Sequence, residues 1–212
     1  MRTRTSGVLI LALLATACSK APGRGPAASY DSKTGKLATL SVDTNRNGKV
    51  DTVSHMDGTR IVRIEVDQDE NGQLDRWDFY GADRRLERVG FSRENDGVMD
   101  AVAYYESEGV LSRMEISTRR DGTFDRVEQY VNGRLTRTAE DTDGDGRADK
   151  WDEYGPLSAN GSADFVVVST LFDDSKRGKP ERRFVYGHNG AIARVEVDPD
   201  GDGVFTPAAT SR

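Results

Sequence analysis

Aspartate, asparagine and glycine recur in this chain at fixed spacing, in the pattern Asp-x-[Asp/Asn]-x-[Asp/Asn]-Gly-x-x-Asp. Side-chain oxygens at positions 1, 3, 5 and 9 of the pattern, together with the main-chain carbonyl at position 7, suit a hard cation. Calcium binds about 6–8 oxygen ligands in proteins, whereas magnesium keeps several waters and requires stricter octahedral geometry. Glycine at position 6 allows the left-handed backbone that folds the chain around an ion. The pattern therefore predicts Ca²⁺ sites.

Seven segments follow this pattern with different completeness, and we number them loops 1 to 7 in chain order. Four of them supply the ligands that we predict. These are Asp43, Asn45, Asn47, the Lys49 carbonyl and Asp51 in loop 1; Asp67, Asp69, Asn71, the Gln73 carbonyl and Asp75 in loop 2; Asp141, Asp143, Asp145, the Arg147 carbonyl and Asp149 in loop 5; and Asp198, Asp200 and Asp202 in loop 7. Loop 5 matches the pattern best, whereas loop 7 has Thr206 in place of the closing carboxylate.

The other three loops depart from the pattern. Loop 3 offers the weaker set Ser92, Glu94, Asp96 and Asp100. Arg119 occupies position 3 of loop 4 and Arg177 occupies position 5 of loop 6, so we expect a guanidinium to replace the ion and predict that both loops are empty. All seven segments also fit tight Asp/Gly turns without metal. The carboxylates gathered in loops 2 and 5 argue against that alternative, because like charges repel unless an ion or a basic neighbour offsets them.

The loops are evenly spaced along the chain, which indicates an internal repeat. The position-6 glycines lie 24, 25, 25, 24, 32 and 25 residues apart, at Gly48, Gly72, Gly97, Gly122, Gly146, Gly178 and Gly203. A second series of glycines falls between them, at Gly35, Gly58, Gly109, Gly133 and Gly190. A fixed period of this size is typical of repeat architectures.

Within each repeat, the residues alternate as in β-strands. Ile61–Val66 places Val62, Ile64 and Val66 on one face, and 192–197 repeats the pattern. Period-two alternation with Asn-Gly and Asp-Gly turns indicates β-hairpins. We therefore predict an all-β fold over residues 30–206, with about seven tandem β-hairpin repeats of ~25 residues in an elongated antiparallel meander or solenoid-like sheet, followed by a tail at 207–212. A small β-propeller is the alternative, although seven hairpins make an odd number of half-blades.

Stacked repeats would align equivalent residues across the sheet. We expect Tyr30, Tyr80, Tyr105, Tyr130, Tyr154 and Tyr186 to lie near a column formed by Leu37, Ile61, Leu86, Leu111, Leu135 and Ile192. We also expect Arg63, Arg88, Arg113, Arg137 and Arg194 to neighbour acidic residues such as Asp78, Glu128 and Asp152. Such cross-strand charge pairs contribute about 0.2–1 kcal/mol each.

Two motifs carry a resemblance to known families. The stretch from Tyr130 to Arg137, Tyr-x-x-Gly-x-Leu-x-Arg, resembles the YD repeats of Rhs-type proteins, which implies strand-turn-strand units; seven units are too few to enclose cargo as large members do. The acidic loops resemble the first nine positions of an EF-hand loop. With strands on both sides, they are more similar to the calcium hairpins of integrin-type propellers. Position 12, the bidentate Glu of an EF-hand, is Ser54, Asp78 or Asp152 here.

The N-terminus is typical of an export signal. Residues 1–17 combine basic residues, an apolar run and small residues, and the run is too short for the ~20 residues of a membrane span. Cys18, the only cysteine, follows directly, which resembles a bacterial lipobox. That resemblance implies that Cys18 carries acyl chains such as palmitate, and Ser19 beside it implies the outer membrane of a Gram-negative cell. Residues 18–29 have the composition of a flexible tether.

The charge balance and the scarcity of catalytic side chains narrow the function. The chain carries a formal charge of −6, which disfavours nucleic acid as a partner. His55 and His188 are the only histidines, and no catalytic constellation stands out. We expect a calcium-binding, non-enzymatic outer-membrane lipoprotein, periplasmic or surface-facing, that acts in adhesion, as a scaffold or in an envelope complex. Its expected partners are membrane lipid through Cys18 and an envelope protein or glycan.

Two other functions stay open. A carbohydrate-binding module would stack sugars on Trp77, Trp151 and the tyrosine column. A hydrolase is the least favoured, because no carboxylate pair stands out from the repeat pattern. The clearest break in that pattern is the insertion at 155–172, whose apolar part 165–172 would cover the core, protect an edge or dock a partner.

Overall fold

The computed structural model describes residues 25–106, 108–156 and 165–209. They form fifteen β-strands: β1 (Ala27–Tyr30), β2 (Leu37–Val42), β3 (Thr52–Asp57), β4 (Arg60–Val66), β5 (Arg76–Tyr80), β6 (Leu86–Phe91), β7 (Ala101–Tyr105), β8 (Leu111–Ile116), β9 (Arg126–Val131), β10 (Arg134–Glu140), β11 (Lys150–Pro156), β12 (Phe165–Phe172), β13 (Arg182–Tyr186), β14 (Ile192–Val197) and β15 (Thr206–Pro207). None of these segments is a helix that could cross a membrane.

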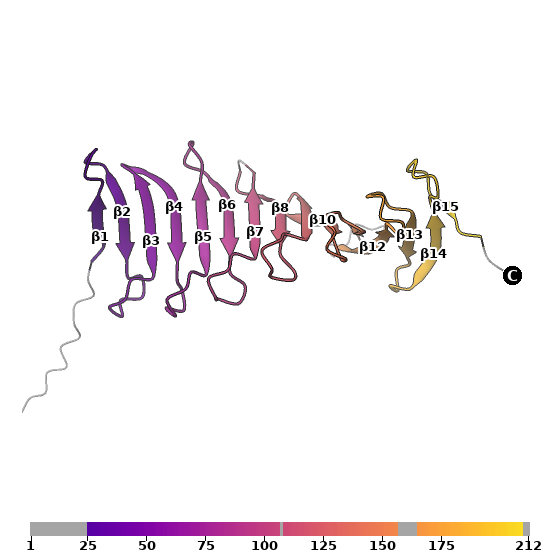
Figure 1. Ribbon diagram of the computed structural model, residues 1–212, viewed down its shortest axis with the longest axis horizontal. Coiled ribbons are helices and arrows are strands. Elements are labelled where there is room, and N and C mark those ends of the chain that lie inside the picture. Colours follow the sequence, from indigo (N-terminus) through magenta and orange to yellow (C-terminus); the bar gives the residue numbers. More distant parts are fainter. Residues whose placement is uncertain (1–24, 107, 157–164, 210–212) are drawn as a thin grey trace, which may run out of the picture.

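The strands form one open antiparallel sheet in which every strand pairs with its neighbours in sequence, from β1 to β15. The predicted hairpin meander is therefore confirmed, and the propeller alternative is wrong. Because strands alternate in direction, the acidic loops all lie along one edge of the sheet and the shorter turns along the other (Figure 1). We call these the loop edge and the turn edge.

The sheet extends slightly beyond its predicted limits. β1 begins at Ala27, inside the segment expected to be a tether, because residues 27–30 pair with β2. At the other end, β15 includes Pro207. The predicted signal peptide at 1–17, the lipidated Cys18 and tether residues 18–24 lie outside the described residues, as do residues 157–164 of the insertion and 210–212 of the tail.

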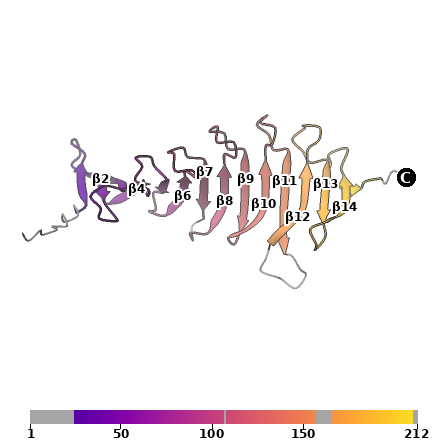
Figure 2. The ribbon, with the colours of Figure 1, turned by 90° about the horizontal axis from the view of Figure 1, so that it is seen from below.

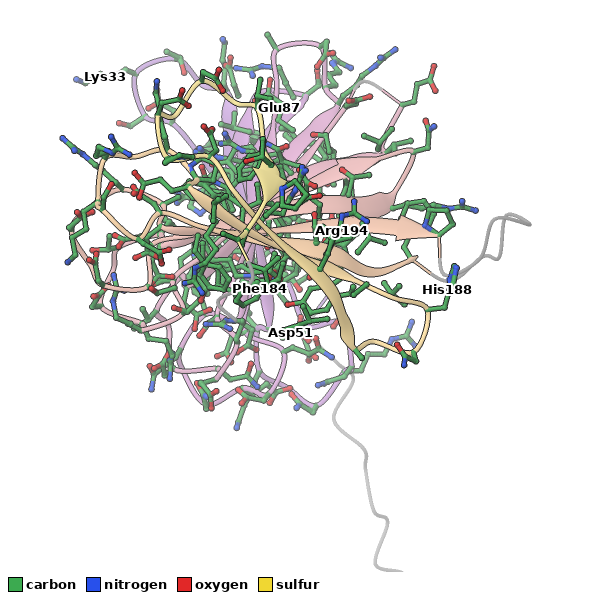
Figure 3. The ribbon with its side chains drawn as sticks, turned by 90° about the vertical axis from the view of Figure 1, so that its right-hand side faces the viewer. Lys33, Asp51, Glu87, Phe184, His188 and Arg194 are labelled. Carbon is green, nitrogen blue, oxygen red and sulfur yellow. The ribbon has the colours of Figure 1, made fainter. Side chains whose placement is uncertain are left out.

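The sheet twists strongly along its length. In Figure 1 the N-terminal strands are seen face-on and the strands around β10 to β12 nearly edge-on; after a quarter turn, in Figure 2, β8 to β14 are face-on and β2 to β6 edge-on. Along the long axis, the strands fan out and side chains project from both faces (Figure 3). Such twist follows from the sterics of L-residues and accumulates with each strand.

The predicted tyrosine–leucine pairs are present on one face, which we call the tyrosine face. Tyr80 lies opposite Leu86 and Tyr105 opposite Leu111. The same pairing joins Tyr30 to Leu37, Tyr130 to Leu135 and Tyr186 to Ile192, whereas Tyr154 lies opposite Val167 and Ile61 opposite Met56.

The predicted arginines do neighbour acidic residues, as where Arg137 lies opposite Glu153, but the acids named for them, Asp78, Glu128 and Asp152, are wrong. A β-bulge beside the tyrosine, or beside Met56 in the β3–β4 hairpin, shifts each turn-edge hairpin by one residue, so that Arg88 lies opposite Phe79 instead of Asp78. Likewise, Arg137 lies opposite Gln129 and not Glu128. Because successive residues of a strand point to opposite faces, the shift moves the arginines away from these acids. Arg63, Arg88, Arg113, Arg137 and Arg194 share the other face, which we call the arginine face.

Asp78, Glu128 and Asp152 instead form ion pairs with basic residues of their own strands, and acids of the arginine face do the same. On the tyrosine face, Arg76 Nε lies 2.6 Å from Asp78 Oδ1. On the arginine face, Arg113 lies 2.7 Å from Glu115. Residues i and i+2 of a strand share a face, so these pairs need no neighbouring strand.

The sheet has a thin core on each face, formed where side chains of one face cover one another. The buried apolar residues are Trp77, Val89, Ala101, Val102, Ala103, Trp151 and Leu171. Cation–π contacts also cover apolar side chains on the sheet: the Arg88 guanidinium lies 4.4 Å from the centre of the Phe79 ring. In loop 3, Met99 covers Gly90, where an added Cβ would meet Met99 Sδ at 2.7 Å.

Candidate cation-binding loops

The seven acidic loops occupy residues 43–51, 67–75, 92–100, 117–125, 141–149, 173–181 and 198–206, and backbone hydrogen bonds join each to the next. The N–H at position 1 of loops 2 to 7 donates to the position-9 carbonyl of the loop before. For example, Asp67 N lies 2.9 Å from Asp51 O. The position-9 N–H of loops 1 to 6 donates back to the end of the preceding strand, as from Asp75 to Val66. The loops therefore form a stacked row with a fixed spacing.

Within a loop, the carboxylate at position 1 organises the turn. In loop 5, Asp141 Oδ1 accepts from Gly144 N at 2.7 Å, and Asp141 Oδ2 accepts from Gly146 N at 2.8 Å. Gly146 has a φ of 87°, a left-handed conformation that costs a residue with a Cβ. The glycines at position 6 of all seven loops share this conformation, so the sequence pattern follows from this backbone geometry.

The carboxylate at position 9 closes the loop from the other side. Asp51 Oδ2 accepts from Thr44 N at 2.8 Å, and Asp125 Oδ1 accepts from Thr118 N at 2.8 Å. Burial raises the pKa of Asp51, but hydrogen bonds from the Thr44 and Thr52 hydroxyls and the Thr44 N–H outweigh it and lower the pKa. The ionised form is therefore the one that the loop stabilises.

Three loops bring three carboxylates close enough to share one ion. In each group the ligand oxygens lie within 4.8 Å of one another. The groups are Asp67, Asp69 and Asp75 in loop 2; Asp141, Asp143 and Asp149 in loop 5; and Asp198, Asp200 and Asp202 in loop 7. Among the described residues, all three groups come from loops that the sequence predicts, and loop 1 contributes only the two carboxylates of Asp43 and Asp51.

Loop 2 is the group best prepared for a cation. Asp67 Oδ2 accepts from Gly72 N at 2.9 Å, whereas Asp67 Oδ1 is buried and finds no hydrogen-bond partner in the described part of the chain. Asp75 Oδ2 is held by Gln68 N at 2.6 Å. The loop carries four acidic side chains and no basic one. A buried carboxylate oxygen without a partner is costly unless a cation or donor reaches it.

Loop 5, the best match in sequence, is already partly neutralised. Lys176 from loop 6 forms an ion pair with Asp143, and this contact lowers the pKa of Asp143. Asp145 Oδ1 accepts from Arg147 N at 2.9 Å and is not a member of the close group. The structure therefore favours loop 2 over loop 5 as a cation site. The sequence ranks them the other way, because the spacing of residues within a loop does not reveal which side chain reaches it from the next loop.

Loop 7 carries three acids and no basic residue. Asp198 is 1% exposed, and its carboxylate accepts from Gly201, Asp202 and Gly203 N–H groups at 2.9–3.3 Å. Burial raises the pKa of Asp198, but these N–H groups and the Asp200 side chain outweigh it and lower the pKa. The ligand set here is Asp198, Asp200 and Asp202, since Thr206 pairs with Val197 in the sheet.

Guanidinium groups enter loops 4 and 6 as expected from their sequences. In loop 4, Arg119 lies 3.4 Å from both Asp121 and Asp125. In loop 6, Arg177 forms an ion pair with Glu181 and donates to Ser175 Oγ at 2.8 Å. Both arginines sit among the positions that carry ligands in the acidic loops. Whether these two loops are empty stays a prediction.

Loop 3 is neutralised by arginines that the sequence pattern did not single out. Arg120 of loop 4 pairs with Asp96 and, at 2.9 Å, with Asp100; Arg93 lies 3.1 Å from Asp100 on its other oxygen. The side chain of Asp100 is fully buried, so two arginines offset the cost of its charge.

Another feature missed from the sequence is the apolar residue at position 8 of every loop. These residues are Val50, Leu74, Met99, Phe124, Ala148, Pro180 and Phe205. Two of them cover the arginine face: Met99 lies over Gly90, and Arg183 lies 4.5 Å above the ring of Phe205. The signal was available as an apolar residue at a constant place in an otherwise polar loop.

The aromatic residues expected to stack on sugars are differently placed. Trp77 and Trp151 are only 9% and 7% exposed, so they belong to the core. An open hollow of about 380 Å³ lies on the tyrosine face near β11 to β13, where Phe172, Tyr186, Lys150 and Asp152 line it. The Tyr186 hydroxyl donates to Thr170 Oγ1, which donates to Asp152.

Comparison with protein-family models and with curated proteins finds no match to this chain. What the loops do is therefore inferred from their own residues.

Proposed function

We propose that the protein is a non-enzymatic lipoprotein of the outer membrane whose β-sheet is stabilised by calcium in the acidic loops. Acylated Cys18 would anchor the chain, and the sheet would act as a rigid scaffold or adhesive surface for an envelope protein or glycan. The anchor rests on the N-terminal sequence alone.

The observation that carries the calcium proposal is the arrangement of loop 2. Three carboxylates converge, one of their oxygens is buried without a partner, and no basic residue belongs to the loop. Backbone N–H groups hold Asp67 and Asp75 by their Oδ2 atoms, which leaves Asp67 Oδ1 for an ion. Carboxylates held in this way form a hard-oxygen site that needs little rearrangement on binding.

The compartment also favours calcium. A lipoprotein is exported, and extracellular calcium modules function with dissociation constants of about 10⁻⁴–10⁻³ M. Removing Arg2 and Arg4 with the signal peptide leaves 28 basic and 36 acidic residues, a net charge near −8. Divalent cations bound in the loops would relieve the repulsion in so acidic a chain.

A scaffold function is supported by the contacts that polar side chains of the arginine face make with one another. His55 Nε2 lies 2.7 Å from Glu65, beside Arg63, on the open arginine face. The long side chains of that face pair with one another, as Arg194 does with Glu196 at 2.6 Å. These contacts stiffen the sheet surface.

Calcium titration by calorimetry tests the proposal. The protein should bind calcium with millimolar or tighter affinity, and Asp67→Asn with Asp69→Asn should remove one site. Asp83→Asn, at the opposite turn edge, is the control and should remove none. Absence of calcium binding, or equal binding by the loop 2 variant, would contradict the calcium site.

The anchor is tested separately, by fractionating cells that express the full chain. Wild type should pellet with outer membranes and incorporate labelled palmitate, and Cys18→Ala should do neither. Equal behaviour of the two would refute the lipid anchor without affecting the calcium proposal.

Saccharide binding is a second candidate, favoured by the hollow on the tyrosine face. Phe172 and Tyr186 offer ring surface there, and Lys150 and Asp152 offer charged hydrogen-bonding groups. A glycan array probed with calcium-loaded protein tests it. Binding that is lost in Tyr186→Ala would support this function, and silence across the array would refute it.

A further inference from the structure

The residue at position 4 of every loop has a left-handed backbone. In five of the seven loops it is not glycine: Arg46, Glu70, Asn95, Arg120 and Lys176 have φ values of 54–62°, and Gly144 and Gly201 complete the series. Bulky residues are disfavoured in this conformation. Their presence suggests that the side chain at position 4 has a use that offsets the strain.

For three of these five residues, that use is contact with the preceding loop. Lys176 of loop 6 pairs with Asp143 of loop 5, and Arg120 of loop 4 pairs with Asp96 and Asp100 of loop 3. Glu70 of loop 2 accepts hydrogen bonds from the Asn45 and Asn47 amides of loop 1.

Where position 4 is glycine, the contact runs the other way. Arg119 of loop 4 donates to the Asp141 carbonyl of loop 5 at 3.0 Å, and Arg177 of loop 6 donates to the Pro199 carbonyl of loop 7 at 3.3 Å. No position-4 side chain then exists to add charge to loop 4 or loop 6, and both loops supply their own guanidinium.

We propose that the side chain at position 4 sets the cation affinity of the loop before it, and that a basic residue at this position acts as a built-in counter-charge. This inference rests on the proposed function. Lys176 acts as a tethered cation that calcium must displace from loop 5, and Arg120 closes loop 3. Loop 2 faces only the neutral Asn95, and loop 7 has no described loop after it.

Lys176 and Arg120 should oppose cation binding to different extents. Lys176 is 66% exposed and makes its ion pair from one flexible side chain. Arg120 is 32% exposed and pairs with two carboxylates, one of them fully buried. A divalent ion should therefore displace Lys176 and not Arg120, so that loop 5 binds more weakly than loop 2 and loop 3 does not bind.

The two tryptophans allow loops 2 and 5 to be read separately. Trp77 follows Asp75 of loop 2 by two residues, and Trp151 follows Asp149 of loop 5 by two. Terbium, a luminescent substitute for calcium, is excited by a nearby tryptophan. In a Trp77→Phe background the luminescence reports loop 5, and in a Trp151→Phe background it reports loop 2.

Lys176→Gln should tighten terbium binding at loop 5 by about tenfold, since it removes a positive charge beside a trivalent ion, and should leave loop 2 unchanged. Arg147→Gln removes the same charge from loop 5 itself, without a described contact to Asp143, and should change the affinity far less. Without metal, in EDTA, Lys176→Gln should lower the unfolding midpoint, because Asp143 loses its partner.

The outcomes separate this inference from the proposed function. If loop 2 binds terbium but Lys176→Gln leaves loop 5 unchanged, or lowers stability alone, the inference is wrong and the calcium proposal stands. If loop 2 fails to bind but Lys176→Gln makes loop 5 bind, the inference is supported and the loop 2 site is refuted. Binding by neither loop in any variant overturns both.

Discussion

The backbone N–H of Asp141 donates to the carbonyl of Asp125 across 2.8 Å, and so joins loop 5 to loop 4. The same bond recurs at each of the six junctions between successive loops. The residues that supply the candidate ligands therefore also continue the hydrogen-bonding ladder past the ends of the strands. A change in one loop is expected to alter the stability of the whole sheet.

The first prediction concerns the backbone of loop 5. Gly146→Ala should destabilise the protein by about 1–2 kcal/mol, because a Cβ is disfavoured at its φ of 87° although it would meet no atom within 4 Å. Urea unfolding measures the effect. Gly25→Ala, also without a contact and without a left-handed φ, is the control. Equal stability of Gly146→Ala and wild type would show that the turn geometry is not required.

The second prediction tests how the loops cover the arginine face. Gly90→Ala should destabilise by about 1–3 kcal/mol, because its Cβ would meet the Met99 side chain at 2.7 Å. Met99→Ala removes that obstacle, so the double variant should be more stable than the sum of the two single effects predicts. Thermal unfolding of all four proteins measures this coupling. Strict additivity would mean that Met99 does not pack on Gly90.

Acidification should unfold the sheet. Burial raises the pKa values of Asp51, Asp125 and Asp173, but hydrogen bonds from neighbouring N–H and hydroxyl groups outweigh it, so all three pKa values fall below the ordinary 3.8. The stability that they contribute is present above about pH 4 and is lost as pH falls through their lowered pKa values.

The measurement is the thermal midpoint in EDTA as a function of pH. It should decline below about pH 4, and Asp51→Asn should reduce the slope. A midpoint that is constant or rises on acidification would contradict the ionised state assigned to these loops.

High pH should act through Tyr130. Burial and then the hydrogen bond to Glu128 raise the pKa of its hydroxyl above the usual 10.0. The resulting stability is present below about pH 10 and decreases above it, because the unfolded state loses its proton first. In urea unfolding, Tyr130→Phe should lower the free energy of unfolding by about 1 kcal/mol near neutrality. Above about pH 10 the variant should lose less stability than wild type, because it has no hydroxyl to ionise. Parallel pH profiles for the two proteins would be the contrary result.

The sheet itself was predictable because the period of the sequence fixes the partner of each strand. Tyr130 and Leu135 flank a short turn, and other hairpins of the repeat pair a tyrosine with an apolar residue six or seven positions later, so this pairing follows from one hairpin. The open meander follows in turn, because consecutive hairpins need no long connection. The positions of the acidic loops at one edge are a direct consequence.

The faces were not predictable in the same way. A single-residue bulge between Leu135 and Arg137 moves Arg137 from the face of Glu128 to the opposite face of the sheet. The alternation of residues in the sequence does not predict this bulge. The loops show the same limit: the ligands of loop 5 could be named from their spacing, but Lys176, 27 residues after Asp149, depends on how successive loops stack.

The most direct test of calcium stabilisation is the thermal midpoint of the protein in EDTA, in calcium and in magnesium. At a calcium concentration of about 100 times Kd, each occupied site should add about 2.7 kcal/mol. The midpoint should therefore rise clearly in calcium and much less in magnesium, and Asp67→Asn with Asp69→Asn should reduce the rise. An identical midpoint in EDTA and calcium would mean that the acidic loops are turns that hold no ion.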